Sequence, residues 1–587
     1  MSEPDSQTEE TIYAAGLVPL IIGVTGHRDL VPAELPGIRT AVHSFLSGLQ
    51  QQFPDRPVQV LSPLAAGADR LVAEVALELG MKIIVSLPMP EDLYIKDFDT
   101  ADLLQEFYRL RGEAEAVYEL PIVPGSTREQ ISNYTKHRDY QYAQLGVFLG
   151  AHSHVLLALW DGKQSSDLGG TAQVVEFRRD DVMRGYEPTE QLNSQLLTED
   201  ESDLVYHIVV SRDRENGAPE SGLVPMLGQW LTISESQPRQ SALSETYVKV
   251  FERTSEFNRE ARAHQKEIEE ESYPLINKED AALLPEVTRT IHRLFCAADW
   301  LAIHYQAKRM TSLRVTHSLA FLMGMVFLFY ADFEARRLFV LVFFACFMLA
   351  FVIHNYSARQ QWHAKYLEYR TLAEGLRVQF YWAAAGVTTE MITKFSHENF
   401  LQKQDIELGW IRNVMRVASI GCDIAPNLDP QGVEIVVREW VGDADEGGQL
   451  RYYSTKKSTY RERAQRIDSL ANLTSIVVGI ILVLCVIVSS DATRTTLFLA
   501  LGAMLLLFGV RQAYAFQVAE KDVIKQYEFM HSIFATAERR IRRASSDTEK
   551  RRILRVLGEA ALDEHAQWIF LHRDRPADAA GFLRMES

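Results

Sequence analysis

The chain has 587 residues, of which 47% are hydrophobic, and a formal net charge of −17 at pH 7. This length allows several domains, and the acidic balance excludes nucleic acid as the main partner because a phosphate-binding face needs clustered Lys and Arg. The four cysteines are widely spaced and form no CxxC pair, which argues against a disulfide framework and predicts no metal site.

Residues 1–17 are predicted to be a flexible N-terminus. This segment is acidic and polar over Met1 to Glu10. It lacks the basic-then-apolar pattern of a signal peptide, so we expect the following domain to stay in the cytosol.

Residues 18–180 alternate between apolar strands and amphipathic helices. Strands are expected at 19–24, 58–61, 82–87, 120–123 and 154–160, and helices at 34–53, 68–79, 105–118 and 136–149. Apolar strands between amphipathic helices indicate a parallel sheet with helices on both faces, an α/β Rossmann-like domain. Ligands of such sheets bind at the carboxyl ends of the strands.

The loop after the first predicted strand is rich in glycine and polar residues. Its candidate ligand-binding residues are Gly23, Thr25, Gly26, His27 and Arg28. Glycines let backbone amides approach a phosphate, and an arginine can pair with a phosphate through two hydrogen bonds. A glycine-rich first turn is also common in α/β folds that bind nothing there.

Two further loops open a helix and present free amide groups with the positive helix end. Candidates in the second loop are Ser62, Ala66, Gly67 and Asp69, and those in the third are Trp160, Asp161, Lys163, Gly169, Gly170 and Thr171. Helix starts of this kind attract anions. Three such loops on one edge predict a nucleotide or phosphosugar site, with ordinary turn glycines as the alternative.

Several of these side chains also allow simpler interpretations. Asp69 and His27 could form an acid–base pair, but Asp69 could instead charge a helix start, and His27 could bind a ligand or a loop carbonyl. Turn chemistry is the simpler interpretation of Asp161, and ligand recognition that of Lys163.

The motifs GVTGHR, SPLAAGAD, WDGK and GGTA together resemble the SLOG superfamily, a Rossmann-like group that includes the LOG nucleotide hydrolases and the sensor heads of TRPM channels. The resemblance implies a nucleotide-derived ligand, ADP-ribose-like or a cyclic nucleotide, and no covalent cofactor. The chain departs from the PGGxGTxxE motif of LOG enzymes: no Pro precedes the glycines, and Glu176 lies farther from Thr171. The resemblance therefore favours binding over hydrolysis; an enzyme would use Asp69 or Glu176.

Residues 181–285 are predicted to be an acidic linker and coupling subdomain. A strand pair is expected near 206–210 and 229–233, followed by a long helix over 244–271. No catalytic pattern is evident in this segment.

Four apolar segments in two hairpins predict a membrane protein. They cover about 314–331, 338–355, 470–489 and 494–513. With their flanks they approach the ~20 residues that cross a bilayer. Their outer flanks are basic, and positive charge prefers the cytosolic side. We therefore expect a multi-pass protein of the inner membrane with both termini and all soluble domains in the cytosol.

The unit "helix, two membrane helices, helix" is expected twice, at 286–400 and 441–587, with a connector at 401–440. This arrangement resembles the SLATT domains, which are predicted pore-forming effectors of bacterial nucleotide-sensing systems that defend against phages. The combination implies a ligand-gated membrane effector or ion channel. Four membrane helices per chain are too few to enclose an ion pathway, so a homo-oligomer is expected. A membrane-anchored nucleotide hydrolase (LOG-like or NAD-consuming) and a non-conducting membrane scaffold remain as alternatives.

Overall fold

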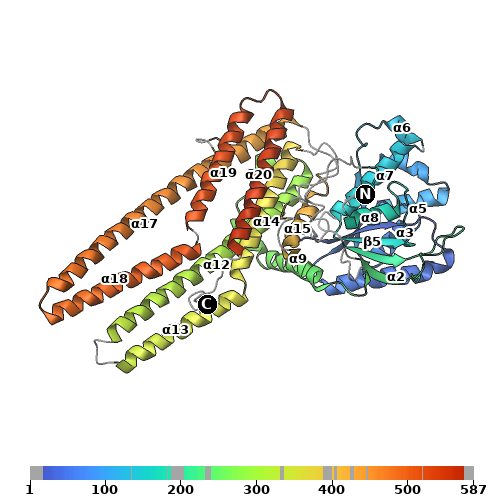
Figure 1. Cartoon of the computed structure of the whole chain (residues 1–587). Helices are drawn as coiled ribbons and strands as arrows, with labels where there is room; N and C mark the ends of the chain where they lie inside the picture. Colours follow the sequence, from blue (N-terminus) through green and yellow to red (C-terminus); the bar gives the residue numbers. More distant parts are fainter. Residues whose placement is uncertain are drawn as a thin grey trace, which may run out of the picture. The chain divides into compact units, whose positions relative to one another are not determined.

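The computed structural model describes most of the chain, and the predicted flexible N-terminus lies almost wholly outside the described residues. These are 17–133, 135–180, 183–186, 204–231, 239–330, 336–387, 400–401, 406–422, 429–443, 447–518 and 520–573. The chain forms two compact units, one of residues 1–298 with 372–432 and one of residues 299–371 with 433–587. Each unit is described by itself (Figure 1).

The first unit contains an eight-stranded sheet in the order β4-β3-β2-β1-β5-β6-β7-β8. The strands are β1 Leu20–Gly26, β2 Val58–Ser62, β3 Lys82–Leu87, β4 Ala116–Glu119, β5 Val155–Trp160, β6 Val205–Val209, β7 Gly228–Leu231 and β8 Arg239–Gln240. All pairs from β4 to β6 are parallel, and the last two are antiparallel. The predicted α/β class is confirmed.

Eleven of the following twelve helices lie wholly in this unit, and the last, α16, begins here and ends in the second unit. They are α2 Leu35–Gln52, α3 Ala68–Glu78, α4 Glu91–Tyr94, α5 Ala101–Gly112, α6 Arg128–Ser132, α7 Lys136–His152, α8 Thr171–Asp180, α9 Glu245–Ala263, α10 Gln265–Glu271, α11 Lys278–Ala281, α15 Gly409–Ser419 and α16 Pro430–Val436. Short 3-10 turns occupy η1 Pro32–Glu34, η2 Ile95–Asp97 and η4 Ile406–Leu408. The predicted long helix over 244–271 is interrupted at His264, which leaves helical geometry between α9 and α10.

Helices cover both faces of the sheet, as β1 shows. Side chains alternate between the two faces of a strand. A Cβ at Gly23 would lie 2.8 Å from the Ser153 Cβ, beside α7, whereas a Cβ at Gly26 would lie 2.4 Å from the Ala68 Cβ on α3. Because these glycines are three positions apart, α7 and α3 pack on opposite faces. Gly23 lies inside β1, as the predicted strand at 19–24 implies, and Thr25 and Gly26 also belong to β1 and not to the loop after it.

Two elements differ from their predicted positions. The helix expected at 105–118 is α5, which begins four residues earlier because the Thr100 side chain caps it by accepting a hydrogen bond from Leu103 N. The strand expected at 120–123 is β4, which begins at Ala116 and pairs in parallel with β3. Propensity alone did not locate the helix end, which Gly112 and the pairing of Ala116 with Ile84 determine.

The segment that the sequence predicts to be a linker contributes to the same sheet. The expected strand pair is present as β6 and β7, and β6 pairs in parallel with β5. The helix α9 also packs on this unit, because Asn258 exchanges hydrogen bonds of 2.8 and 3.0 Å with the backbone of Val18. The head therefore extends well beyond residue 180.

The second unit is helical. Its elements are α12 Glu286–Tyr330, α13 Arg336–Arg359, α14 Trp362–Ala385, the π-helical turn η5 Val437–Val441, α17 Gly448–Ile487, α18 Asp491–Val518, α19 Glu520–Ile541 and α20 Asp547–Arg573. The start of α12, up to residue 298, and the end of α14, from residue 372, belong to the first unit. Both helices therefore run from one unit into the other. The repeated pattern of a long helix, a hairpin and a further helix is present as α12–α14 and as α17–α19.

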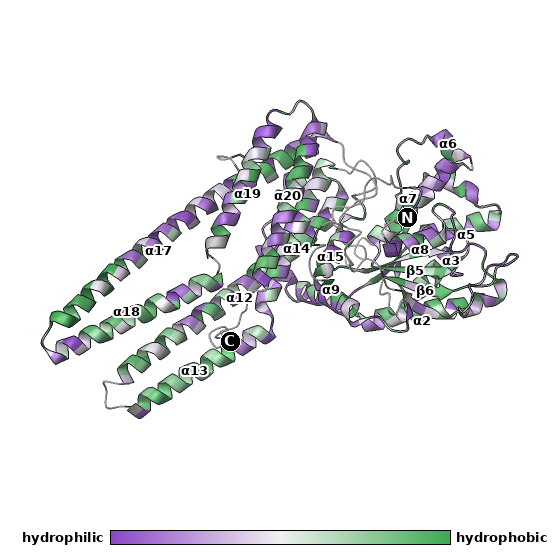
Figure 2. Ribbon diagram, viewed as in Figure 1, coloured by the Kyte–Doolittle hydropathy of each residue, from purple (hydrophilic) through white to green (hydrophobic). Residues whose placement is uncertain are grey.

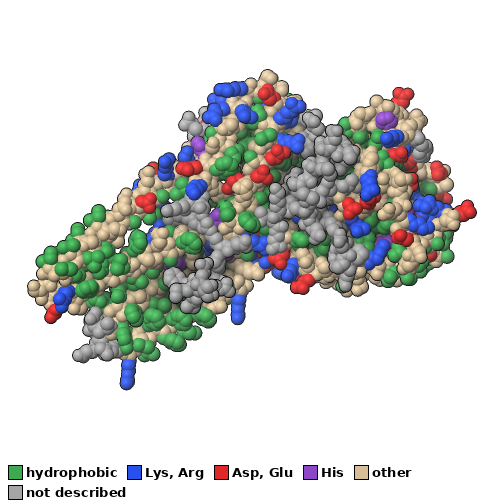
Figure 3. Space-filling model, in the orientation of Figure 1, with side chains coloured by type: hydrophobic (Ala, Val, Ile, Leu, Met, Phe, Trp, Pro, Cys, Tyr) green, Lys and Arg blue, Asp and Glu red, His purple; other side chains and the backbone are tan. Residues whose placement is uncertain are grey.

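Four of these helices are long and apolar enough to cross a membrane. Only 6% of each apolar window is buried. Figure 2 shows the apolar ends of α13, α17 and α18 in green, and Figure 3 shows hydrophobic side chains on the surface of both hairpins. An exposed apolar surface of this size is stable only in an apolar surrounding. The chain is therefore a membrane protein with a soluble α/β head.

The two hairpins meet along an antiparallel seam between α12 and α18. A Cβ at Gly324 of α12 would lie 2.4 Å from Leu506 of α18, and a Cβ at Gly502 of α18 would lie 2.8 Å from Leu328 of α12. On each helix, the glycine thus packs against a leucine side chain of the other helix. Small residues allow such close approach of helices in membranes.

Candidate functional site

The candidate site lies where the chain reverses direction across the sheet. From β1 the chain proceeds to β2 on one side, and it returns to β5 on the other side of β1. In open α/β sheets ligands bind at the carboxyl ends of the strands beside such a switch point. Here β1 ends at Gly26 and β5 at Trp160. The sequence candidates that follow these strands therefore meet at one edge.

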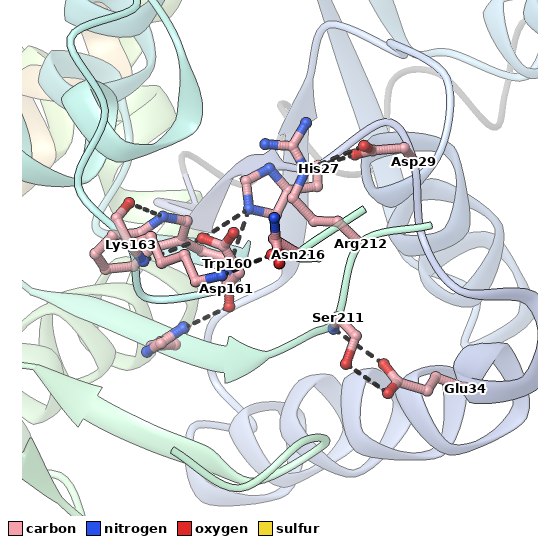
Figure 4. Close-up of polar contacts among 10 residues, drawn as sticks. His27, Asp29, Glu34, Trp160, Asp161, Lys163, Ser211, Arg212 and Asn216 are labelled. Atoms are coloured by element: carbon pink, nitrogen blue, oxygen red, sulfur yellow. Dashed lines mark hydrogen bonds and ion pairs between the residues drawn. The ribbon is translucent and has the colours of Figure 1, made fainter. Parts of the chain in front are cut away.

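His27 links the ends of β1 and β5. Its Nε2 lies 3.1 Å from the backbone nitrogen of Asp161 and 3.2 Å from the Asp161 Oδ1 (Figure 4). Burial lowers the pKa of His27, with the Asp161 carboxylate opposing that shift. A neutral ring protonated on Nδ1 accepts the Asp161 N–H. The ring is thus engaged with the protein, and the arrangement favours a positioning role over that of a free base.

Trp160, Asp161 and Lys163 form a compact turn. The Asp161 Oδ1 accepts a hydrogen bond of 3.1 Å from Lys163 N, and Trp160 Nε1 donates to the Lys163 carbonyl at 3.0 Å. Gly162 between them has a φ of +85°, which favours glycine. Asp161 therefore performs the turn chemistry that the sequence suggested. The Lys163 ammonium reaches the Asn216 carbonyl at 2.9 Å.

The loop after β6 completes this part of the edge, and the sequence reasoning missed it. Arg212 Nε donates to the Asp29 carboxylate at 2.8 Å (Figure 4). Ser211 donates through its backbone and its hydroxyl to Glu34, at 3.0 and 2.6 Å. These residues were not predictable from a motif. Only the predicted strand at 206–210 could have indicated them, because its carboxyl end lies at the same edge when the strand pairs in parallel with β5.

Arg28 is the exposed cation of the site. Its guanidinium carbon lies 5.5 Å from the centre of the Tyr142 ring. The Tyr142 hydroxyl in turn donates to Asp97, whose other oxygen accepts from Arg138 Nη2 at 2.6 Å. None of the ion pairs among the described residues includes Arg28. Arg28 is thus oriented by an aromatic ring but keeps its charge available for an anion.

Asp69 lies buried in the first turn of α3, near Arg28. Its Oδ2 accepts a hydrogen bond of 3.3 Å from Ala65 N, while its Oδ1 has no hydrogen-bond partner in the described part of the chain. Burial raises the pKa of Asp69 to about 7, against the opposing effect of Arg28. Asp69 is therefore a carboxyl group that can change its protonation near neutral pH, in the place where Arg28 meets the start of α3.

The glycines of the first two loops serve close packing between these loops. Ala68 N donates to the His27 carbonyl at 3.1 Å. Gly67 has a φ of +84°, and a Cβ there would lie 2.4 Å from the Arg28 carbonyl oxygen. The buried Ser62 hydroxyl accepts from Leu64 N at 3.1 Å and shapes the same loop. Thr25 is buried in β1, and Ala66 is half-buried beside Gly67.

The third loop lies against Tyr142. Gly169 has a φ of +74°, and a Cβ there would lie 2.7 Å from the Tyr142 Cβ. The Gly169 N–H donates to the Gln173 side chain at 3.1 Å, and Gly170 N donates to Asp167 at 3.0 Å. Thr171 begins α8 and is half-buried. The backbone of Arg28 thus packs against Gly67 before α3, and its side chain lies against Tyr142, which the loop before α8 also contacts. These are the two helix starts that the sequence predicted to attract an anion.

Glu176, the other candidate for catalysis, lies in α8 and forms a 2.9 Å ion pair with Arg184. Among the described residues, Glu176 forms no hydrogen bond or ion pair with His27 or Asp161. No group of three or more metal-ligating side chains occurs in the described ranges. The arrangement can bind an anion at Arg28, and its only titratable group with an unsatisfied oxygen at this edge of the described head is Asp69.

Comparisons with known proteins add no family. A scan against protein-family models finds no match, and a search of curated proteins finds no significant relative.

Proposed function

We propose that the α/β head binds a nucleotide-derived ligand and thereby gates an oligomeric membrane effector, an ion channel. The observation that carries this proposal is Arg28. It is an exposed cation at the switch point, placed beside two helix starts and without a carboxylate partner in the described part of the chain. A phosphate group satisfies both an arginine and the amide groups of a helix start. The SLOG-like motifs support a nucleotide over other phosphates.

Coupling to the membrane would run through α12 and α14. α12 is one continuous helix of 45 residues that starts in the unit of the head and ends in a candidate membrane span. A ligand shifts such an equilibrium only by its differential affinity for the two states. A coupling of ~1–3 kcal/mol is ordinary for allosteric proteins. The SLATT-like architecture supports an oligomeric pore in the inner membrane, with the head in the cytosol and a role in phage defence.

The direct test is ligand binding by the full chain in lipid nanodiscs. Isothermal titration with ADP-ribose, NAD+ and a set of cyclic nucleotides should show heat with at least one compound. Arg28→Glu should abolish that binding, since it places a negative charge beside the two helix starts. The matched control is Arg128→Glu on α6, which alters an exposed ion pair with Asp92 and should leave binding unchanged. Absence of heat with every compound would exclude nucleotide sensing.

Gating requires a second measurement. Vesicles that contain the chain should release a trapped ion only after the bound compound is added. Binding without any flux would support the membrane scaffold instead of the channel.

A nucleotide hydrolase is the second candidate, because Asp69 combines an unsatisfied oxygen with a pKa of about 7. A general base needs a pKa near the working pH. This function predicts product formation, detectable by chromatography, that Asp69→Asn abolishes while ligand binding persists. Unchanged compound after prolonged incubation would exclude it.

A further inference from the structure

The N-terminal half of α17 is strongly basic in a chain that is acidic overall. Between residues 451 and 468 it carries six basic residues and two acidic ones, Glu462 and Asp468, which gives a local charge of +4 in a chain of −17. The basic residues are Arg451, Lys456, Lys457, Arg461, Arg463 and Arg466. Figure 3 shows basic side chains in blue along α17 next to its hydrophobic end. This clustering places positive charge directly before the second membrane hairpin.

Three of these arginines are exposed and weakly engaged. Arg461 and Arg463 are exposed and form no hydrogen bond or ion pair with another described residue. Arg466 lies 3.8 Å from Glu462, and both side chains of this pair are largely exposed. An exposed ion pair of this kind contributes little to stability. We call Arg461, Arg463 and Arg466 the arginine collar.

Three basic residues around the first hairpin are engaged differently, whereas Arg314 and Arg359 there are exposed like the collar. Arg309 donates to the Gln517 carbonyl at 3.2 Å and also lies 5.9 Å from the Tyr366 ring centre. Lys308 and Lys365 both lie within 5.2 Å of the centre of the Tyr305 ring. In these three residues the protein itself supplies a partner for the cation. The arginine collar has no comparable partner among the described residues, which leaves its charges available to a partner outside the chain.

The position of the collar indicates that the membrane surface could supply this partner. The exposed apolar surface of α17 begins at Leu470 and Leu473. At about 1.5 Å per residue, Arg466, Arg463 and Arg461 lie roughly 6, 10 and 14 Å from Leu470 along the axis. The polar layer of a leaflet is about 5–8 Å thick. Charges also act over a Debye length of about 8 Å at physiological ionic strength. The collar therefore lies within reach of the lipid headgroups.

We propose that the arginine collar binds the phosphate headgroups of anionic glycerophospholipids in the leaflet on the side of the head. Guanidinium groups pair with phosphate through two parallel hydrogen bonds. Successive residues turn by about 100° on a helix, so Arg463 and Arg466 lie on one side and Arg461 on the opposite side. The collar thus contacts lipids around the helix. Basic clusters beside a membrane helix recognise anionic lipids by this electrostatic mechanism. The proposal does not depend on a nucleotide ligand.

The test uses the full chain in a neutral detergent. Phosphatidylglycerol and phosphatidylcholine are titrated separately, and bound lipids are counted by native mass spectrometry. Wild type should bind phosphatidylglycerol at least tenfold more tightly than the variant with Arg461→Gln, Arg463→Gln and Arg466→Gln. About fivefold per arginine is ordinary near a charged surface. Phosphatidylcholine should bind equally to both.

The matched control is a triple variant at the far end of α19, with Arg539→Gln, Arg540→Gln and Arg543→Gln. These exposed arginines follow the membrane segment by more than twenty residues of helix. The control should keep the wild-type preference, and circular dichroism should show that both variants fold. Equal phosphatidylglycerol affinity in wild type and the collar variant would overturn the proposal. So would full displacement of the lipid by inorganic phosphate at matched ionic strength, since it would show a general anion site.

Discussion

The head and the membrane hairpins use similar apolar residues in opposite ways. In β5 the run from Val155 to Trp160 is buried throughout. In α17 apolar residues such as Ile476, Val483 and Val486 are exposed, Val486 by 86%. In the head, water drives these side chains together. In the hairpins they would be solvated by lipid tails, which are as apolar as leucine. The same composition therefore stabilises a folded core in one region and an insertion into the bilayer in the other.

The strongest test of this comparison truncates one leucine in each region. Leu157 of β5 is fully buried, and Leu482 of α17 is 47% exposed. We expect Leu157→Ala to lower the free energy of unfolding by about 2–5 kcal/mol, because it leaves a cavity. Leu482→Ala should cost less than about 1 kcal/mol, because lipid fills the space. Thermal unfolding in nanodiscs measures both. A large effect at Leu482 would contradict the lipid environment and indicate a contact with another copy of the chain.

The second test concerns Asp69, the buried charge of the head. Its pKa of about 7 lies above its ordinary value of 3.8, so the folded chain holds a proton that the unfolded chain has already lost between these pH values. The ionisation of Asp69 therefore does not lower the free energy of unfolding below about pH 4, and it lowers this free energy increasingly as the pH rises to about 7. Three pKa units correspond to about 4 kcal/mol as an upper bound.

The measurement compares Asp69→Asn with wild type in thermal melts from pH 5 to pH 8. The variant should be more stable at pH 8, and the difference should shrink towards pH 5. A difference that is independent of pH would mean that Asp69 is not protonated near neutrality in the folded chain.

The third test concerns the glycine seam between α12 and α18. Gly324→Ala places a Cβ against Leu506, which should cost about 1–3 kcal/mol by overpacking. The double variant Gly324→Ala with Leu506→Ala should recover much of that loss. Gly509→Ala on α18 is the control, since nothing lies within 4 Å of its new Cβ. Equal melting of the Gly324 and Gly509 variants would show that the seam is not closely packed in the membrane.

The smallest effect is expected for two hydroxyls in the apolar part of α17. Thr474 and Ser475 donate to the carbonyls of Leu470 and Ala471, at 2.8 and 3.0 Å. Hydroxyls bonded to their own helix tolerate a lipid surrounding. Thr474→Val with Ser475→Ala should change stability by less than about 0.5 kcal/mol and leave ion flux unchanged. A clear change in flux would place these residues on the conduction path.

The sequence predicted the position of the candidate site better than it predicted the role of each residue there. Loops after β1, β2 and β5 do meet at one edge, because parallel strands present their carboxyl ends together. However, Gly26 and Gly67 mainly let two loops pack against each other, and His27 is engaged with Asp161. Tyr142, which lies against Arg28, and Asp97, which accepts a hydrogen bond from Tyr142, carried no motif. They come from helices whose docking on the sheet no local pattern records.

The sequence by itself determined the alternation of strands and helices in the head and the four apolar segments in two hairpins. Both are local properties, since they depend on the spacing and the run length of apolar residues along the chain. Tertiary structure alone decided that β6, β7 and β8 extend the sheet of the head. It also decided that Gly324 and Gly502 receive leucines across a seam and that Asp69 keeps an unsatisfied oxygen near Arg28. These features arise from contacts between residues far apart in the chain, and only the folded backbone brings them within reach.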